Sequence, residues 1–188
     1  LREKRLEWAG NLDLPAFTTE HEYCLFTCCT TAYDADSRRA GRALPQLLKY
    51  ADIAFGTLDT EENCCGDPAY RLGAGDIFSE LALKNTELFL RAGVQKILTN
   101  SPHCLNNFRN NYEGLKDLVA VEHYTELLDR LVKQGFIRPI MEVADTVTYH
   151  DPCYLGRHQD IYEAPRRILQ SIPGLTLIEM PSNRENSL

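Results

Sequence analysis

Seven cysteines are the side chains of this 188-residue chain that could carry chemistry. Cys29 stands alone, Cys64 and Cys65 are neighbours followed by Gly66, and Cys104 comes much later. Long spacers of similar length separate these three groups. Thiolates that arrive from separate loops suit an iron–sulfur cluster, because each iron takes a sulfur ligand. The spacing therefore predicts a cluster site held by these four cysteines.

The adjacent pair Cys64 and Cys65 is informative. Neighbouring cysteines bridge one another only with strain, yet both can reach a cluster of several irons. Gly66 lets the backbone pass close to inorganic sulfide, and its amide can donate a hydrogen bond to the sulfur. An odd number of cysteines also fits poorly with a closed disulfide framework. We therefore interpret the thiols as ligands in a reducing compartment, the cytoplasm.

Other interpretations stay open for individual cysteines. Cys24 lies in a strand-like run, where cysteine is often a small buried apolar residue. For Cys28 we favour an inert role over that of a ligand. A structural zinc site of four cysteines is the alternative for the whole set, in a non-redox assembly module. Such sites usually use two Cys-x-x-Cys knuckles, and the sequence has none.

Two histidines flank cysteines, His103 and His150. For both we favour an orienting hydrogen bond or a helix cap. The functional alternative is a proton donor near a cluster that reduces a disulfide, because each released thiolate needs a proton. His150 and Asp151 are the better candidates for that catalytic role.

The apolar pattern alternates between strands and helices, which places these residues. Strands are expected at 23–28, 53–58, 96–100, 117–121, 146–149 and 175–179, and helices at 37–50, 76–92, 125–134 and 162–171, with a short helix from about residue 105. Short connections imply parallel strands covered by helices, an α/β fold of βαβ units. Sites in such sheets collect at the carboxyl ends of the strands. We therefore expect the cysteines and the segment 150–153 at one edge of the sheet.

The chain also contains an internal repeat. Cys29, an arginine pair that opens a helix and a later strand recur, in the same order, from Cys153 onward. The repeat predicts a first half at 21–145 and the truncated start of a second half at 146–188. The charged stretch before them, at 1–20, is expected to be a lead-in or linker helix. By the same comparison, a cysteine pair is expected directly after the last residue in a longer protein.

A net charge of -7 argues against nucleic acid as a partner, because phosphate binding needs a basic surface. We interpret Arg157 and the pair Arg166-Arg167 as a solvated face. No stretch of this segment is long and apolar enough for a membrane span, so any membrane association would come from elsewhere.

Together these motifs resemble the CCG cysteine-rich domain of heterodisulfide reductase subunits and their relatives. The family motif is a Cys, a long spacer, Cys-Cys-Gly, another long spacer and Cys-x-x-Cys, often present twice. The residues that match are Cys29, Cys64, Cys65, Gly66 and Cys104. The segment 149–157, which contains Cys153, resembles the opening of a second copy.

The resemblance implies an iron–sulfur electron-transfer subunit with a [4Fe-4S] cluster, cubane or non-cubane. Electrons would come from a flavoprotein or a ferredoxin-type cluster and pass to a disulfide or a quinone, in a complex that could lie at the cytoplasmic face of a membrane. Ser101 departs from the family pattern, since the first Cys of Cys-x-x-Cys is expected there. Four cysteines suit a cubane, while an oxygen ligand from Ser101 or a substitute ligand from Cys28 stays open. Cys153 alone should not hold a second cluster.

Overall fold

The computed structural model describes residues 3–187. They fall into two compact units, of which the first ends at His123 and the second begins at Tyr124. The first unit contains, in order, η1 (Glu3–Trp8), β1 (Tyr23–Phe26), α1 (Cys29–Tyr33), α2 (Ala35–Tyr50), β2 (Phe55–Gly56), η2 (Asp59–Glu61), α3 (Asp67–Arg71), α4 (Gly75–Arg91), β3 (Lys96–Thr99), α5 (Pro102–Asn110), η3 (Glu113–Leu115) and β4 (Ala120–His123). The second contains α6 (Tyr124–Gln134), β5 (Thr146–Val147), α7 (Glu163–Gln170), β6 (Thr176–Leu177) and η4 (Arg184–Asn186). The η elements are single stretches of 3₁₀ helix.

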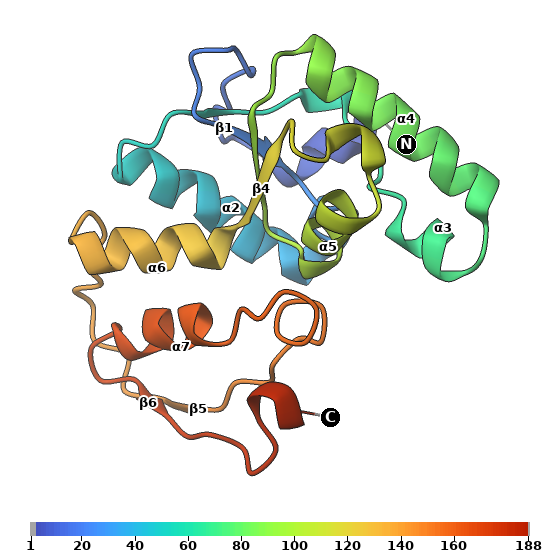
Figure 1. The fold of residues 1–188 in the computed structure, drawn as a ribbon. Coiled ribbons are helices and arrows are strands. Elements are labelled where there is room, and N and C mark those ends of the chain that lie inside the picture. The colour runs from blue at the N-terminus through green and yellow to red at the C-terminus, as the bar shows by residue number, and fades with distance from the viewer. Residues whose placement is uncertain (1–2, 188) are drawn as a thin grey trace. The chain divides into compact units, whose positions relative to one another are not determined.

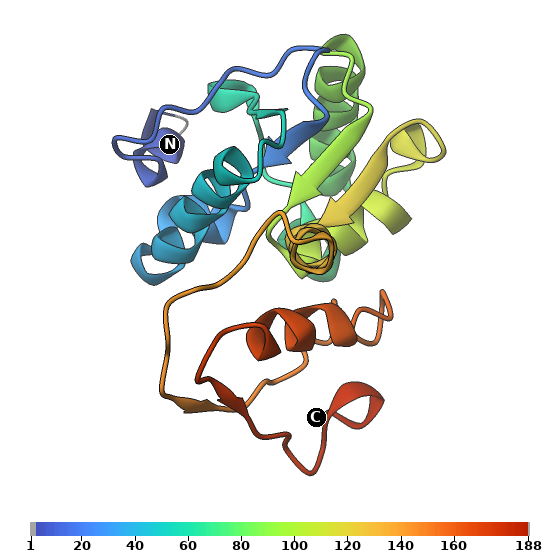
Figure 2. The same ribbon diagram turned by 90° about the vertical axis from the view of Figure 1, so that its left-hand side faces the viewer.

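The first unit is built on a four-stranded sheet in the order β2-β1-β3-β4, with every neighbouring pair parallel (Figure 1). Helices cover both faces: α1 and α2 lie on one side of the sheet, and α4 and α5 on the other (Figure 2). Helix crossovers between parallel strands bury the sheet on two faces, which explains why all of β1 is apolar and buried. The expected α/β fold is confirmed.

Aromatic side chains fill the interior between the sheet and α4 and α5. The rings of Phe26 and Phe108 meet edge to face with centroids 4.9 Å apart, and Phe89 packs against both. All three side chains are almost completely buried. Such edge-to-face pairs add stability beyond the area that they bury. The core therefore fixes β1 and α5 against each other. β1 leads to Cys28 and Cys29, and α5 contains Cys104.

The sequence pattern located the long elements but missed the short ones. The two helices of five residues, α1 and α3, were not expected, because so few residues show no clear helical period. The strands β2, β5 and β6 are also shorter than expected, with two residues each. Helix α2 begins at Ala35, two residues before the expected start, because the Asp34 side chain accepts a hydrogen bond from the Ser37 amide at 2.8 Å and so caps the helix.

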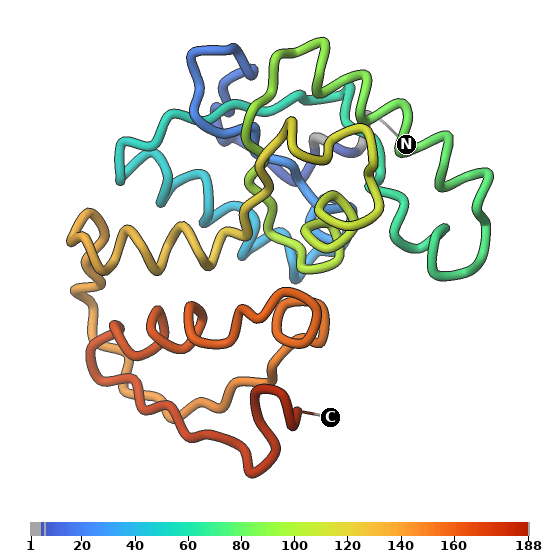
Figure 3. Tube along the Cα trace, viewed as in Figure 1, coloured from blue at the N-terminus to red at the C-terminus, as the bar shows by residue number. Residues whose placement is uncertain are grey.

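The N-terminal stretch, expected as a lead-in, contributes side chains to the interior of the first unit. Trp8 is 3% exposed and packs against Ala32 of α1. The Arg5 side chain is also buried. Figure 3 shows how the chain leaves this stretch, enters the sheet and later passes through α3 into α4. The first helical turns thus cover α1, the element that begins at the first cysteine of the motif.

The second unit contains a small βαβ unit, in which β5 and β6 pair in parallel with α7 between them. The expectation that the strand at 146–149 shares a sheet edge with the others was wrong, because β5 pairs with β6 in a sheet of their own. The expectation that Arg166 lies on a solvated face was also wrong. Its guanidinium is buried and forms two hydrogen bonds with Asp151, at 2.6 and 2.7 Å.

No helix among residues 3–187 meets the length and hydropathy needed to cross a membrane.

Candidate functional site

Cysteines of the first unit follow the carboxyl ends of three neighbouring strands. Cys28 and Cys29 come directly after β1, Cys64 and Cys65 follow β2, and Cys104 follows β3. Because parallel strands end at the same edge of a sheet, the three loops meet there. For these residues the predicted convergence is confirmed.

The five thiols form a row in which each side chain contacts the next. Cys29 hydrogen-bonds with Cys64, and Cys64 with Cys65. The Sγ atoms of Cys65 and Cys104 are 3.3 Å apart, and Cys104 hydrogen-bonds in turn with Cys28. All of these cysteines are free rather than bridged. Cys24 is buried within β1 and is not part of the row, as its apolar interpretation predicts.

Polar side chains fix the Cys64-Cys65 turn through hydrogen bonds to its backbone carbonyls. The Asn85 amide on α4 donates to the carbonyl of Cys64 at 2.9 Å. The carbonyl of Cys65 accepts from the Asn107 amide at 2.6 Å and from the Tyr112 hydroxyl at 2.8 Å. Sequence reasoning missed these three residues. An asparagine within the apolar stripe of a helix is the signal that would have indicated Asn85 and Asn107, since a buried amide needs hydrogen-bond partners.

Arg5 brings a buried positive charge to one end of the row. Its Nη1 lies 3.4 Å from the Sγ of Cys29, and its Nη2 donates to Glu62 at 3.0 Å and to the carbonyl of Thr27. The two charged side chains are 4% and 3% exposed. Burial raises the pKa of Glu62 to about 7, against the opposing effect of Arg5. Sequence reasoning missed this pair, because nothing in the local pattern connects the N-terminal stretch to the loops.

Two backbone features shape the other loops. Gly66 has φ of 81°, a left-handed conformation, and its amide points to the Sγ of Cys64 at 3.4 Å. Ser101 precedes α5, and its hydroxyl accepts a hydrogen bond from the Cys104 amide at 3.4 Å. His103 contacts the buried Asp67 carboxylate at 2.9 Å, in agreement with the orienting hydrogen bond favoured for it.

Proton sharing along the row divides the thiols into two groups. A hydrogen bond with Cys104 lowers the pKa of Cys28 to about 5. Hydrogen bonds with Cys104 and Cys64 also lower the pKa of Cys65 well below its usual range. The pKa of Cys104 is raised by its contacts with Cys28 and Cys65, and that of Cys29 by its contact with Cys64 and by burial. Although a hydrogen bond with Cys29 opposes it, the contact with Cys65 and burial raise the pKa of Cys64 as well. Cys28 and Cys65 are therefore the thiols of the row that lose a proton most readily, and a positively charged group would favour their thiolates further.

The donor set fits an iron–sulfur cluster. Sulfur is a soft ligand, and here it comes from several loops whose amides and carbonyls are already fixed by hydrogen bonds. Within residues 3–187, no three His, Cys, Asp or Glu side chains surround a single point as ligands of one metal ion. Cys29, Cys64, Cys65 and Cys104 are the residues that would hold the cluster.

The predicted residues of the second unit lie around a buried ion pair. Asp151 accepts the two hydrogen bonds from Arg166 and a third from the Arg184 amide at 2.7 Å. Although burial opposes it, hydrogen bonding to Arg166 holds the pKa of Asp151 below its usual range. The carboxylate therefore accepts hydrogen bonds that hold the second unit together, which is a structural role. His150 and Cys153 are both exposed.

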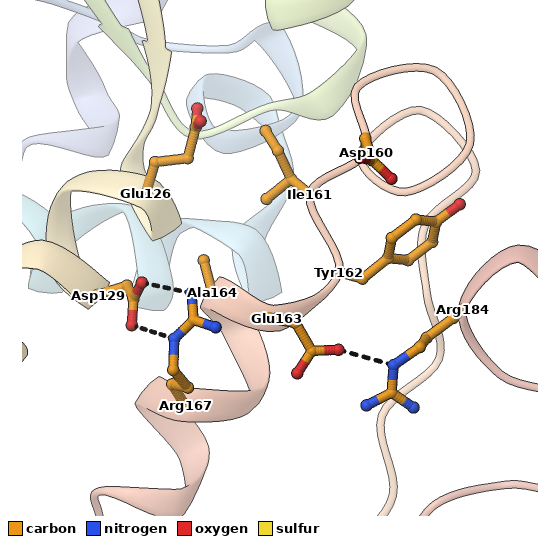
Figure 4. Close-up of a pocket in the computed structure, with 9 residues that line it drawn as sticks. All are labelled: Glu126, Asp129, Asp160, Ile161, Tyr162, Glu163, Ala164, Arg167 and Arg184. Carbon is orange, nitrogen blue, oxygen red and sulfur yellow. Dashed lines mark hydrogen bonds and ion pairs between the residues drawn. The ribbon is translucent and has the colours of Figure 1, made fainter.

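The second unit also contains a hollow of about 420 Å³ beside α6 and α7 (Figure 4). Both arginines that line it pair with carboxylates: Arg167 binds Asp129 at 2.7 Å, and Arg184 binds Glu163 at 2.7 Å. Paired guanidinium groups have less attraction left for an anionic ligand. None of the cysteines lines this hollow.

Comparison with known proteins agrees with this arrangement of thiols. The family model described as a cysteine-rich domain, CCG, matches residues 23–109 and 147–187. The chain belongs to the CCG cysteine-rich domain family. The first matched range contains the whole row of thiols, and the second contains Cys153, where the opening of a second copy was expected.

Several curated relatives of this CCG chain are named as oxidoreductases. EtfAB:quinone oxidoreductase of Syntrophomonas wolfei is 40% identical over 92% of this chain and 24% of that protein. The probable iron-sulfur-binding oxidoreductase FadF of Bacillus subtilis is 40% identical over 90% of this chain and 24% of that protein. One subunit of the dihydromethanophenazine:CoB--CoM heterodisulfide reductase of Methanosarcina mazei is 35% identical over 85% of the chain and 40% of that protein.

The chain therefore spans 24% of the length of the first two of these relatives. No solved structure matches it significantly.

Proposed function

We propose that the first unit of this CCG chain holds an iron–sulfur cluster, of the [4Fe-4S] class, on Cys29, Cys64, Cys65 and Cys104. A cluster bound there would accept and release single electrons, so the unit would act as an electron-transfer module of an oxidoreductase. The observation that carries the proposal is the row of unbridged thiols, with Cys65 and Cys104 in contact at 3.3 Å. The iron–sulfur and oxidoreductase names of the relatives support it.

The residues around the row suit such a role. The Arg5 guanidinium and the Gly66 amide both donate toward ligand sulfurs, which lowers the electron density on those sulfurs. Asn85 and Asn107 hold the Cys64-Cys65 turn by its carbonyls, so the two sulfurs keep their position when charge changes. Cys65 and Cys104 are buried, so water has little access to this part of the site.

The donor and the acceptor belong to the whole protein. We propose a flavoprotein or a ferredoxin-type cluster as the donor and a quinone or a disulfide as the acceptor. The names of two relatives, one with a quinone and one with a heterodisulfide, support the two acceptor classes. In the second unit we propose Cys153 as the first ligand of a second site, with the exposed His150 as a proton donor for a released thiolate. Asp151, the other predicted candidate, is held as a carboxylate by Arg166.

The first test is the metal content of the anaerobically purified protein. We expect iron and acid-labile sulfide, and a brown colour that dithionite bleaches. Cys64→Ala or Cys65→Ala should abolish the chromophore, because each removes a ligand from the middle of the row. Cys24→Ala is the matched control, since Cys24 is buried, as Cys65 is, but lies outside the row.

The alternative function is a non-redox module with structural zinc. One zinc per chain, with no absorbance near 400 nm, roughly the region of thiolate-to-iron charge transfer, would establish that alternative. Full iron and full activity in either cysteine variant would refute the ligand assignment.

A further inference from the structure

Cys28 is a thiol of the row that the proposed ligand set leaves out. It precedes α1 and lies between the sheet and Cys29. Its thiol hydrogen-bonds with Cys104 and with Ser101, and it is partly accessible at the surface. A cysteine kept only for packing would lie among apolar groups, as Cys24 does in β1. Cys28 instead contacts a proposed ligand.

Ser101 stands where the family motif has a cysteine, so this position supplies no sulfur at the Cys104 end of the row. Its hydroxyl oxygen accepts from the Cys104 amide and so caps α5, a helix of nine residues. The hydroxyl is buried and also hydrogen-bonds with Cys28. An oxygen that already caps a helix is a poor candidate for a soft metal site, whereas the neighbouring thiol has the right chemistry.

The loops that carry Cys28 and Ser101 are fixed to one another by Asn100. Its side-chain oxygen accepts from the Cys28 amide at 3.4 Å, and its side-chain nitrogen donates to the Thr31 hydroxyl at 2.7 Å. Asn100 directly precedes Ser101 in the chain. The position of the Cys28 thiol beside Ser101 and Cys104 is thus set by the same residue that begins the α5 loop.

We propose that Cys28 supplies a fifth thiolate to the cluster site, at the place where Ser101 has no sulfur. The inference rests on the proposed function and extends it. Ser101 is then a capping residue rather than an oxygen ligand, and the site offers five sulfurs, one more than an ordinary four-cysteine cubane uses. The row from Cys29 to Cys28 becomes a complete ligand set drawn from three loops.

The test uses the full-length protein, purified anaerobically with its cluster. Cys28→Ala should lower iron and sulfide per chain and change the electron paramagnetic resonance spectrum of the reduced protein. Ser101→Ala should keep the iron and sulfide per chain, because it removes a helix cap and not a ligand, and Cys24→Ala should leave both measurements unchanged. If Ser101→Ala instead alters the spectrum while Cys28→Ala does not, the ligand is the oxygen and the proposal is overturned.

A rescue experiment tests the shared position. The double variant Cys28→Ala/Ser101→Cys should recover the iron content and the spectrum, since it returns a sulfur to the same end of the row. A loss in Cys28→Ala that the second substitution leaves uncorrected would refute the shared position. If Cys28→Ala is unchanged while Cys64→Ala loses the chromophore, only the fifth ligand is wrong. If both are unchanged, the proposed function itself fails.

A measurement on the unmodified protein covers the case in which Cys28→Ala does not fold. Under native anaerobic conditions, iodoacetamide followed by peptide mass spectrometry should find Cys28 protected in the loaded protein and labelled after the metal is chelated. Cys29 is the positive reference in the same sample. Labelling of Cys28 in the loaded protein, with Cys29 protected, would overturn the proposal.

Discussion

At the scale of single residues, Arg5 and Glu62 form a buried ion pair at the Cys29 end of the row. Burying a charged side chain costs free energy, and pairing it with an opposite charge offsets only part of that cost. A hydrogen bond to a ligand sulfur stabilises the more negative, reduced state of a cluster. The pair therefore combines a structural link between the N-terminal stretch and the η2 loop with an effect on the proposed redox centre.

Arg5→Gln should lower the reduction potential of the cluster, because it removes the buried positive charge beside the Sγ of Cys29. The expected decrease is about 40 mV, which corresponds to roughly 1 kcal/mol for a one-electron couple. A redox titration followed by electron paramagnetic resonance measures it. In Arg5→Lys the positive charge is kept, so the reduction potential should fall by less than in Arg5→Gln.

Lys84→Gln is the control for charge alone, because it removes a lysine from an exposed pair with Glu80 on α4. The idea that Arg5 tunes the centre is wrong if Arg5→Gln and Lys84→Gln have the same potential. If the potential falls equally in both, the general charge of the protein is responsible.

At the scale of elements, the close approach of α1 and α2 decides where the first two cysteines lie. Gly41 of α2 faces Thr31 of α1, and a Cβ atom at position 41 would lie 2.1 Å from the Cγ2 of Thr31. Only glycine permits this distance. The helix α1 begins at Cys29, so the packing of the two helices positions one end of the thiol row.

Gly41→Ala should destabilise the protein by about 1–3 kcal/mol, the usual cost of overpacking, although alanine favours helices by roughly 1 kcal/mol. The free energy of unfolding by urea measures the change, and iron content reports whether the row is disturbed. Thr31→Ser removes the obstructing methyl group but keeps the hydroxyl that binds Asn100, so the double variant should recover stability.

Gly75→Ala is the matched control, because Gly75 begins α4 and a Cβ there meets nothing within 4 Å. We expect that substitution to be neutral or slightly stabilising. Equal effects of Gly41→Ala and Gly75→Ala would show that helix propensity, rather than the contact with α1, governs the response.

At the scale of the whole molecule, the proposed cluster belongs to one of two units. All five thiols of the row and the side chains that fix their loops lie in residues 1–123. The second unit is held by contacts of its own, among them the ion pair of Asp151 and Arg166 and that of Asp129 and Arg167. A ligand that binds only the folded state stabilises the part that binds it.

Removal of the cluster with a chelator under anaerobic conditions should therefore loosen the first unit selectively. Hydrogen exchange should accelerate in the loops after β1, β2 and β3 and at the start of α5, while the amides of α7 keep their rates. The Cys64→Ala protein, which should hold no cluster, is the control and should not respond to the chelator. Equal acceleration in both units would refute the assignment of the site to the first unit.

Much of the fold could be predicted because its signals are local. The apolar run of β1 and the amphipathic pattern of helices such as α4 can each be recognised within a single segment. The separate sheet of β5 and β6 could not be predicted in this way. Pairing depends on which strands lie side by side, and two strands of two residues carry no pattern that names their partner.

The sequence by itself determined the chemistry of this protein: the types and spacing of Cys29, Cys64, Cys65 and Cys104, the alternation of strands and helices, and the family. Only the tertiary structure decided which residues surround the thiols. It brought Arg5 and Cys28 to the two ends of the row and buried Arg166 against Asp151. The physical reason is that covalent spacing and local periodicity are written along the chain, whereas a buried contact between distant segments exists only once the core has packed.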